Sequence, residues 1–391
     1  MFIFNKLKEN LFEIQTRLYE NRLVNLLWLL NIVPKFAGFS IVGDNDKISA
    51  PFWIIHLSLL FYVYGVGNFV YQIEFAQGAG DFIKSYVNVS ILILTLNNSY
   101  WFINKRPLLK TVLRQVTEND KLSQETQSLH EKYKNLLSVV KIIVFIFYGS
   151  NLFNAAFIYL PHRVDVSNDY YAMSPCVGLE PLTSSPNREV CLAIQCLQEF
   201  TIMMVVLNYQ ALLLFLIAHT AVMYEMLSEE MFLLDELDHD RNNNDTIREK
   251  LCSLIKRHSI TLDIVRNLKL LYSVPLGVNF GSNAVCISLF FYLPLQEWNS
   301  FIPILIYCFL VFFLYCYLCQ KMINSSEKFE RAVYCCGWES FDVKEKKIVY
   351  IVLLMAQKPI HILAADIIPV NIYTFATTLQ AMFKFVTVVK F

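Results

Sequence analysis

The sequence is poor in residues that divide a chain into separate parts. Only 11 glycines and 12 prolines occur in 391 residues, and no Gly/Ser-rich or Pro-rich linker is present. No internal repeat of a fixed period is visible, which argues against repeat architectures. Charged residues make up 17% of the chain and cancel to a formal net charge of zero. A nucleic-acid-binding protein needs a basic face, so we expect no nucleic-acid partner.

Catalytic and metal-binding motifs are also missing. The sequence has no Gly-x-Ser-x-Gly, no P-loop and no His-Glu-x-x-His, and its 7 histidines are scattered. The 10 cysteines do not follow a zinc or disulfide framework. Cys316 and Cys319 lie in an aromatic run, where a thiol behaves as a small hydrophobic group. We therefore expect no enzymatic activity, no metal and no cofactor.

Apolar residues are what the chain has in excess. They make up 55% of the sequence, and aromatic residues 15%, whereas soluble domains contain about 45–50% apolar residues. Apolar windows of roughly 20 residues, enough to cross about 30 Å of hydrocarbon, occur at seven places. The predicted spans are Pro51–Ile73, Phe82–Ile103, Leu136–Leu160, Val190–His219, Leu270–Leu295, Phe301–Cys319 and Asp366–Phe391. The sequence thus predicts an all-α membrane protein with seven transmembrane helices.

The positions of Lys and Arg predict the orientation. Most of them fall in four segments: 1–50, 104–135, 220–269 and 320–364. The connections 74–81 and 296–300 contain no Lys or Arg, and 161–189 contains two. Because positive residues favour the cytoplasmic side, we expect a cytoplasmic N-terminus and an extracellular C-terminus.

This orientation is the reverse of a G-protein-coupled receptor. The chain also lacks an Asp/Glu-Arg-Tyr triplet after the third span and an Asn-Pro-x-x-Tyr in the seventh. A transporter would be expected to show matching halves with broken spans. Pro275 and Gly277 interrupt the fifth span, but no second half matches it. A seven-helix class with inverted topology fits better than either alternative.

The C-terminal part carries the most informative residues. From Ala332 the chain reads AVYCCGWESFDVKEKKIVYIVLLMAQKPIHILAADIIPVNIYTFATTLQAMFKFVTVVKF. An aromatic and small-residue run leads into Trp338, and Asp342 precedes a lysine cluster. An apolar helix, the turn Gln357-Lys358-Pro359 and a last helix with Phe383-Lys384-Phe385 follow. The chain resembles the insect odorant receptors in these motifs, and in its length, seven spans and inner N-terminus.

Gustatory receptors share this topology and are the alternative that stays open. Their last helix carries Thr-Tyr, five apolar residues and then Gln-Phe. Here Thr374-Phe375 is followed by four residues and then Gln380-Ala381, which favours the odorant branch. The family's co-receptor has a large insertion in its second cytoplasmic loop, whereas segment 220–269 is short. The chain therefore resembles an odorant-tuning subunit.

The resemblance implies a function, partners and a location. A tuning subunit forms a ligand-gated, non-selective cation channel with the odorant receptor co-receptor, as a hetero-oligomer that is expected to be a tetramer. It binds a small volatile organic ligand, lies among lipids in the plasma membrane and is located in olfactory neuron dendrites. The expected organisation is a cytoplasmic segment 1–50, helices one to six with an outer odorant cavity in 51–319, a cytoplasmic assembly segment 320–364 and a pore helix 365–391.

The last helix has a polar stripe. At 100° per residue, five side chains fall within an arc of about 80°: Thr377, Gln380, Lys384, Thr387 and Phe391. Such a stripe lines either a helix contact or a water-filled path. The resemblance implies that it lines the pore, with Thr387 and Phe391 at gate positions. Lys384 belongs to this stripe, but its charge would repel cations in a pore. Its side chain therefore turns toward a neighbouring helix unless it faces the pore with the rest of the stripe.

The resemblance implies that the ligand cavity lies in the outer half of the bundle, between the second, third, fourth and sixth spans. A volatile ligand needs an apolar or aromatic cavity with few hydrogen-bonding groups. The candidate lining residues are Tyr86, Ser90, Phe147, Tyr148, Asn151, Asn154, Phe200, Met203 and Tyr307. For each of them, ordinary core packing is the competing interpretation. Glu199, inside the fourth span, is an unusual residue that is protonated, paired or facing a cavity.

Two cysteines flank the end of the longest outer connection. Cys176 and Cys191 bracket the stretch PCVGLEPLTSSPNREVC. A disulfide is possible there because this connection is expected on the oxidising side. It would stabilise the fold by about 3 kcal/mol through loop closure. The alternative is that Cys191 already lies in the membrane as a free thiol.

Overall fold

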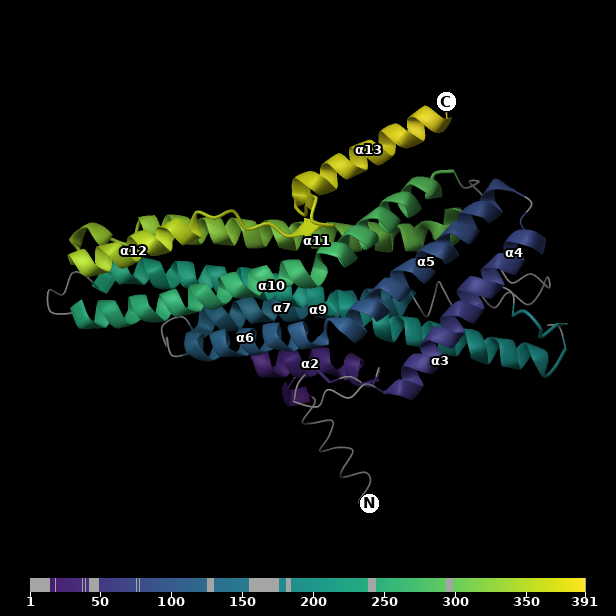
Figure 1. The fold of residues 1–391 in the computed structure, drawn as a ribbon, viewed down its shortest axis with the longest axis horizontal. Coiled ribbons are helices and arrows are strands. Elements are labelled where there is room, and N and C mark those ends of the chain that lie inside the picture. The colour runs from purple at the N-terminus through teal and green to yellow at the C-terminus, as the bar shows by residue number, and fades with distance from the viewer. Residues whose placement is uncertain are drawn as a thin grey trace, which may run out of the picture.

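The computed structural model of the chain describes residues 15–17, 19–36, 38, 40–41, 49–74, 76, 78–124, 130–154, 176–180, 184–237, 244–292 and 298–390. Almost all of its regular structure is helical (Figure 1). The elements are α2 (Leu23–Phe36), α3 (Ala50–Leu60), the π-helix η1 (Phe61–Gly67), α4 (Asn68–Glu74), α5 (Ala79–Asn104), α6 (Arg106–Gln124), α7 (His130–Asn154), α9 (Asn187–Leu237), α10 (Asn244–Phe290), α11 (Trp298–Tyr334), the 3-10 turn η5 (Trp338–Ser340), α12 (Val343–Ala356), β1 (Leu363–Ala364), β2 (Ile368–Pro369) and α13 (Ile372–Lys390).

A helix lies in each of the seven predicted spans, as far as the structure describes them. The seventh span was predicted too long, because Asp366 belongs to the β1–β2 hairpin and helix α13 begins only at Ile372. Five helices in the described parts of the chain are long and apolar enough to cross a membrane: Ala50–Glu74, Glu131–Phe153, Asn187–Leu234, Ile247–Phe290 and Leu305–Ser340. The other two predicted spans correspond to α5 and α13. Helix α5 is less apolar because it buries amide and hydroxyl groups such as Asn88 and Asn98, and α13 carries Lys384. The chain is an all-α, multi-pass membrane protein.

Helix α9 forms the centre of the molecule. It contains 51 residues, and six successive side chains from Leu212 to Ile217 are fully buried. A helix that is apolar on every side is stable only when other helices surround it. Helices α2, α5, α7, α10 and α11 all pack against α9, and a long run of core residues lies on it.

The longest helices extend well past a bilayer. Helix α9 is roughly 76 Å long at 1.5 Å per residue, against about 30 Å of hydrocarbon. Ion pairs join its C-terminal part to its neighbours. Glu229 is 2.7 Å from the ammonium of Lys132 on α7 and 2.6 Å from that of Lys328 on α11. These charges indicate that this end of the bundle is outside the hydrocarbon, where water can reach them.

Helix α10 contains Pro275 and continues through it. Proline has no N–H, so the carbonyl of Leu271 loses its intrahelical donor. The indole of Trp101 on α5 supplies a replacement at 2.8 Å. Two residues later, Gly277 allows Ala365 to approach so closely that a Cβ at Gly277 would lie 2.6 Å from the Cβ of Ala365. The β1–β2 hairpin is therefore seated on α10 beside the proline.

The hairpin carries α13. Ala365 and Asp366 have φ angles of 53° and 57°, the left-handed conformation of a tight turn. Ser273 holds this turn: its carbonyl accepts from the Ala365 N–H at 2.7 Å, and its hydroxyl donates to the Asp366 carboxylate at 2.5 Å. Beyond the hairpin, α13 diverges from the other helices (Figure 1). The turn fixes where α13 begins.

Candidate ligand-binding cavity

One cavity of about 140 Å³ lies among the helices of the bundle. Its walls come from α5, α9, α10 and α11, with Tyr64 of η1 and Asn151 of α7 completing them. Most of the lining surface is apolar, and amides, hydroxyls and one carboxyl interrupt it. The lining residues on the four main helices are Val87, Ser90, Ile91, Leu94, Thr95, Asn98, Glu199, Ile202, Met203, Val206, Leu207, Gln210, Asn279, Asn283, Cys286, Tyr307, Cys308 and Val311.

Four residues that the sequence suggested as ligand contacts line this cavity. They are Ser90, Asn151, Met203 and Tyr307. Tyr86 lies one turn before Ser90 on α5 and hydrogen-bonds to its side chain. The hydroxyl of Tyr307 donates to Gln210 at 2.9 Å. This bond joins α11 to α9 across the cavity.

The other suggested residues lie elsewhere. Phe147 is fully buried in the core, and its ring is 6.3 Å from that of the adjacent Tyr148. Phe200 leaves 45% of its side chain exposed. None of these three is in the cavity wall. Asn154 is in the last turn of α7, but its side chain lies outside the described residues.

Sequence reasoning missed the polar residues contributed by α5 and α10. Thr95, Asn98 and Asn279 are each at most 3% exposed and line the cavity. A usable signal was present, since polar side chains inside apolar spans normally face a partner or a cavity. On α10, Asn279 and Asn283 are one helical turn apart and so share a face. The pocket expected from the sequence does not include the fifth span, so it lacks Asn279 and Asn283.

The segment 176–180, which precedes α9, is attached to the helix bundle near the cavity. Cys176 and Cys191 form a disulfide, with Cα atoms 5.8 Å apart. The disulfide links the segment before α9 to the first turns of α9. One residue further on, the carbonyl of Val177 accepts a hydrogen bond of 2.8 Å from the hydroxyl of Tyr62 on η1. The segment is therefore held to two of the elements that form the cavity wall.

The polar stripe on α13 is spread over the exposed part of the molecule. Thr377 and Thr387 donate to backbone carbonyls of their own helix, at 3.0 Å to Tyr373 and 2.8 Å to Lys384. Gln380 and Lys384 are exposed, and Phe391 lies outside the described residues. The apolar side of the helix contacts α11, where the ring of Phe375 is 5.1 Å from that of Phe312. The stripe faces away from this contact.

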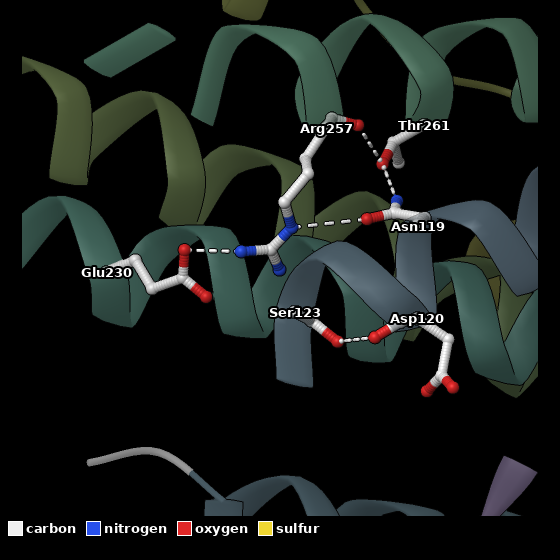
Figure 2. A network of polar contacts seen from close by, with 6 residues as sticks. All are labelled: Asn119, Asp120, Ser123, Glu230, Arg257 and Thr261. Atoms are coloured by element: carbon white, nitrogen blue, oxygen red, sulfur yellow. Dashed lines mark hydrogen bonds and ion pairs between the residues drawn. The ribbon is translucent and has the colours of Figure 1, made fainter. Parts of the chain in front are cut away.

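A second polar cluster lies further along the bundle, at the C-terminal end of α6 (Figure 2). The guanidinium of Arg257 is 1% exposed and forms an ion pair with Glu230. It also donates to Asn119 at 3.2 Å, and Asn119 in turn donates to Thr261 at 2.9 Å. Figure 2 shows that this network joins α6, α9 and α10. The described residues contain no group of three side chains that could hold a metal ion.

Fold and cavity together define a class: a multi-pass helical membrane protein with a mainly apolar cavity among its helices. The model of the family described as 7tm Odorant receptor matches residues 79–383. The chain belongs to this odorant receptor family, and it is a receptor rather than an enzyme.

Relatives and solved structures agree with this assignment. Odorant receptor 10a of Drosophila melanogaster is 26% identical over 184 residues, which are 44% of this chain and 45% of that protein. Odorant receptor 22a of the same species is 26% identical over 152 residues, covering 37% and 38%. The matched stretches thus span less than half of these relatives. The insect olfactory receptor OR5 from Machilis hrabei, solved in complex with eugenol, has a TM-score of 0.75 at 15% identity, over 94% of this chain and 97% of that one.

Proposed function

We propose that this chain is the odorant-tuning subunit of a ligand-gated, non-selective cation channel that it forms with the odorant receptor co-receptor. Its place would be the plasma membrane of olfactory neuron dendrites. One observation carries the proposal: helix α10 both forms a wall of the cavity and contacts the hairpin that leads into α13. A ligand that changes the packing of α10 therefore acts on the start of α13.

The proposed ligand is a small volatile organic molecule. The cavity volume of about 140 Å³ and its mainly apolar lining support this size and chemistry. The Machilis hrabei receptor of the same fold was solved with eugenol, and we propose a small organic ligand here as well. Binding opens the channel only as far as the ligand prefers the open state over the closed one.

The proposed pore is lined by α13. Support comes from its divergence from the bundle (Figure 1) and from the exposed positions of Gln380 and Lys384. In an assembly, this face would meet the equivalent helices of other subunits. Thr377, Gln380 and Thr387 would then supply the polar surface along which hydrated cations move. Lys384 would lie beside them, where its charge would lower cation conductance unless a neighbouring subunit pairs with it.

Helix α12 is proposed to contact other subunits. One side of it is buried on the chain itself through Val349 and Val352. The other side leaves four large apolar side chains between 42% and 62% exposed: Tyr350, Ile351, Leu354 and Met355. An apolar patch of this kind is typical of an interface, and we assign it to assembly of the channel.

Whole-cell recording tests the proposed function. The chain is expressed with and without an insect odorant co-receptor and exposed to a broad panel of volatiles, while G-protein signalling is blocked. We expect odorant-evoked cation currents that require both chains and persist under the block. Currents that disappear under the block, or chains that reach the surface together but respond to no volatile, would contradict the proposal.

A further inference from the structure

The end of the cavity nearest Trp101 can be identified from contacts between α5 and α10. Trp101 donates to the carbonyl of Leu271, and eleven residues earlier on α5, Ser90 hydrogen-bonds to Cys286. The two helices therefore run antiparallel along the cavity. Asn98, one turn before Trp101, and Asn279, on the α10 side, belong to the same end. We call this the amide end of the cavity.

Aromatic rings close the amide end. The ring centroids of Trp101 and Tyr209 are 5.0 Å apart, and those of Trp101 and Tyr272 are 5.1 Å apart. Gln210 follows Tyr209 on α9 and lines the cavity here. Glu199, the carboxyl in the wall, is about three helical turns away along α9. The polar groups at the amide end are thus neutral.

Three buried polar atoms at this end have no hydrogen-bond partner among the described residues. They are the hydroxyl of Thr95, Oδ1 of Asn98 and Nδ2 of Asn279. Their side chains are 1%, 1% and 3% exposed. Buried polar atoms are normally paired, because an unpaired one loses its hydrogen bonds to water without replacement. Three in one cavity wall indicate a ligand that supplies the missing partners.

The types of these atoms select the functional group. Oδ1 of Asn98 needs a donor, Nδ2 of Asn279 needs an acceptor, and the Thr95 hydroxyl can act as either. A ligand hydroxyl both donates and accepts, so it can pair with both amides. A ketone or ester can only accept and leaves Asn98 unpaired, and a hydrocarbon leaves all three. A protonated amine only donates and leaves Asn279 unpaired.

We propose that this cavity takes a small neutral alcohol whose hydroxyl donates to Asn98 and accepts from Asn279 at the amide end, with Thr95 as the third polar contact. This inference rests on the proposed function and adds the ligand class to it. The apolar walls formed by residues such as Leu94 and Val206 enclose the carbon skeleton. They contribute affinity with little selectivity, so the amide end determines which functional group is preferred.

Matched ligand series test the proposal in cells that express the chain with the co-receptor. For short linear, branched, cyclic and aromatic skeletons, the alcohol, ketone, amine and hydrocarbon of each skeleton are compared by the concentration that gives half-maximal current. We expect the alcohol to be about tenfold more potent than the ketone and at least about 100-fold more potent than the hydrocarbon.

The outcomes separate this inference from the proposed function. Currents that respond best to amines, ketones or hydrocarbons would overturn the alcohol assignment and leave the receptor function intact. Silence toward every series, with both chains at the cell surface, would overturn the proposed function and the inference with it.

Variants at the amide end give a second test. Asn279→Leu and Thr95→Val are expected to reduce the alcohol-to-hydrocarbon potency ratio by about tenfold each. The ratio is measured within one variant, so changes in expression do not affect it. Asn97→Leu is the matched control, because Asn97 precedes Asn98 on α5 but is absent from the cavity wall; its ratio is expected to equal that of the native chain. An unchanged ratio in Thr95→Val and Asn279→Leu would overturn the assignment.

Discussion

The indole N–H of Trp101 donates to the carbonyl of Leu271 over 2.8 Å. This carbonyl is the one that Pro275 deprives of its donor, so a side chain from α5 repairs the hydrogen bonding of α10. The bond lies beside the cavity, and Leu271 precedes by two and six residues the hairpin contacts at Ser273 and Gly277. The cavity, Pro275 of α10 and the hairpin before α13 therefore all lie close to this bond.

Removing this donor should destabilise the fold. Trp101→Phe keeps an aromatic ring but leaves the buried Leu271 carbonyl unpaired, which costs about 1–3 kcal/mol. We expect a clear fall in the thermal unfolding midpoint of the receptor in lipid nanodiscs. Trp338→Phe is the control, since its indole bonds to Tyr334 at an exposed site where water can replace it. Equal shifts for the two variants would contradict this role of Trp101.

Gly277 should be intolerant of a side chain. In Gly277→Ala, the new Cβ would lie 2.6 Å from the Ala365 Cβ and 2.9 Å from its backbone nitrogen. The hairpin must then move away, and we expect odorant-evoked current to fall severalfold at unchanged surface expression. Gly281→Ala on the same helix meets nothing within 4 Å and should preserve the current. A fully active Gly277→Ala receptor would show that the hairpin seat does not influence gating.

The buried ion pair should depend on both of its partners. Arg257→Met leaves the Glu230 carboxylate buried without its cation, a change that costs about 3–5 kcal/mol. Arg257→Met combined with Glu230→Gln removes both charges and should recover much of the lost thermal stability. Lys256→Met, which breaks only the exposed pair with Glu118, is the control and should change stability by less than about 1 kcal/mol. A double variant no more stable than Arg257→Met would argue against the pair.

The Cys176–Cys191 disulfide should stabilise the outer side. Replacing both residues with serine removes a cross-link over a sequence separation of 15, worth about 3 kcal/mol by loop closure. We expect a lower unfolding midpoint and loss of the disulfide-linked peptide in mass spectra. Cys252→Ser, at an exposed free thiol, is the control and should leave both unchanged. Free thiols at both positions in the native receptor would contradict the assignment.

Accessibility along α13 tests the pore proposal. A cysteine at Gln380 should react with a charged thiol reagent, and the reaction should reduce the current of the co-expressed channel. The cysteine variant of Phe385 is the control, because Phe385 lies about 140° around the helix, with its ring 6.4 Å from that of Tyr292. Block from Phe385 but not from Gln380 would place the opposite face of α13 toward the pore.

The sequence predicts the helices well because their signal is local. An apolar window of membrane length identifies a span without reference to the rest of the chain, and a helix lies in each of the seven predicted ranges. Which face of a span meets the cavity is a different question. Helix α9 is apolar on all sides, so its pattern does not distinguish Met203, which lines the cavity, from Phe200, which is exposed. That distinction depends on how neighbouring helices pack.

The residues at the amide end could not be grouped from the sequence either. Asn98 and Asn279 are far apart in the sequence and line the same cavity because α5 and α10 pack against each other. Pro275 and Gly277 are visible as an interruption of the fifth span. Their partners, Trp101 and Ala365, depend on tertiary packing that no local pattern contains.

The length of helix α9 also affects how motion can pass through the molecule. It carries Glu199, Met203 and Gln210 in the cavity wall, and Glu229 and Glu230 in the charged part of the bundle, without an internal proline. A helix of about 76 Å that tilts as one body by about 2° around its centre moves each end by roughly 1.3 Å. In the proposed mechanism, a ligand that displaces the cavity end of α9 would also displace its other end. Helix α10 contains Pro275 and lacks one backbone hydrogen bond there, so it can bend more easily than α9.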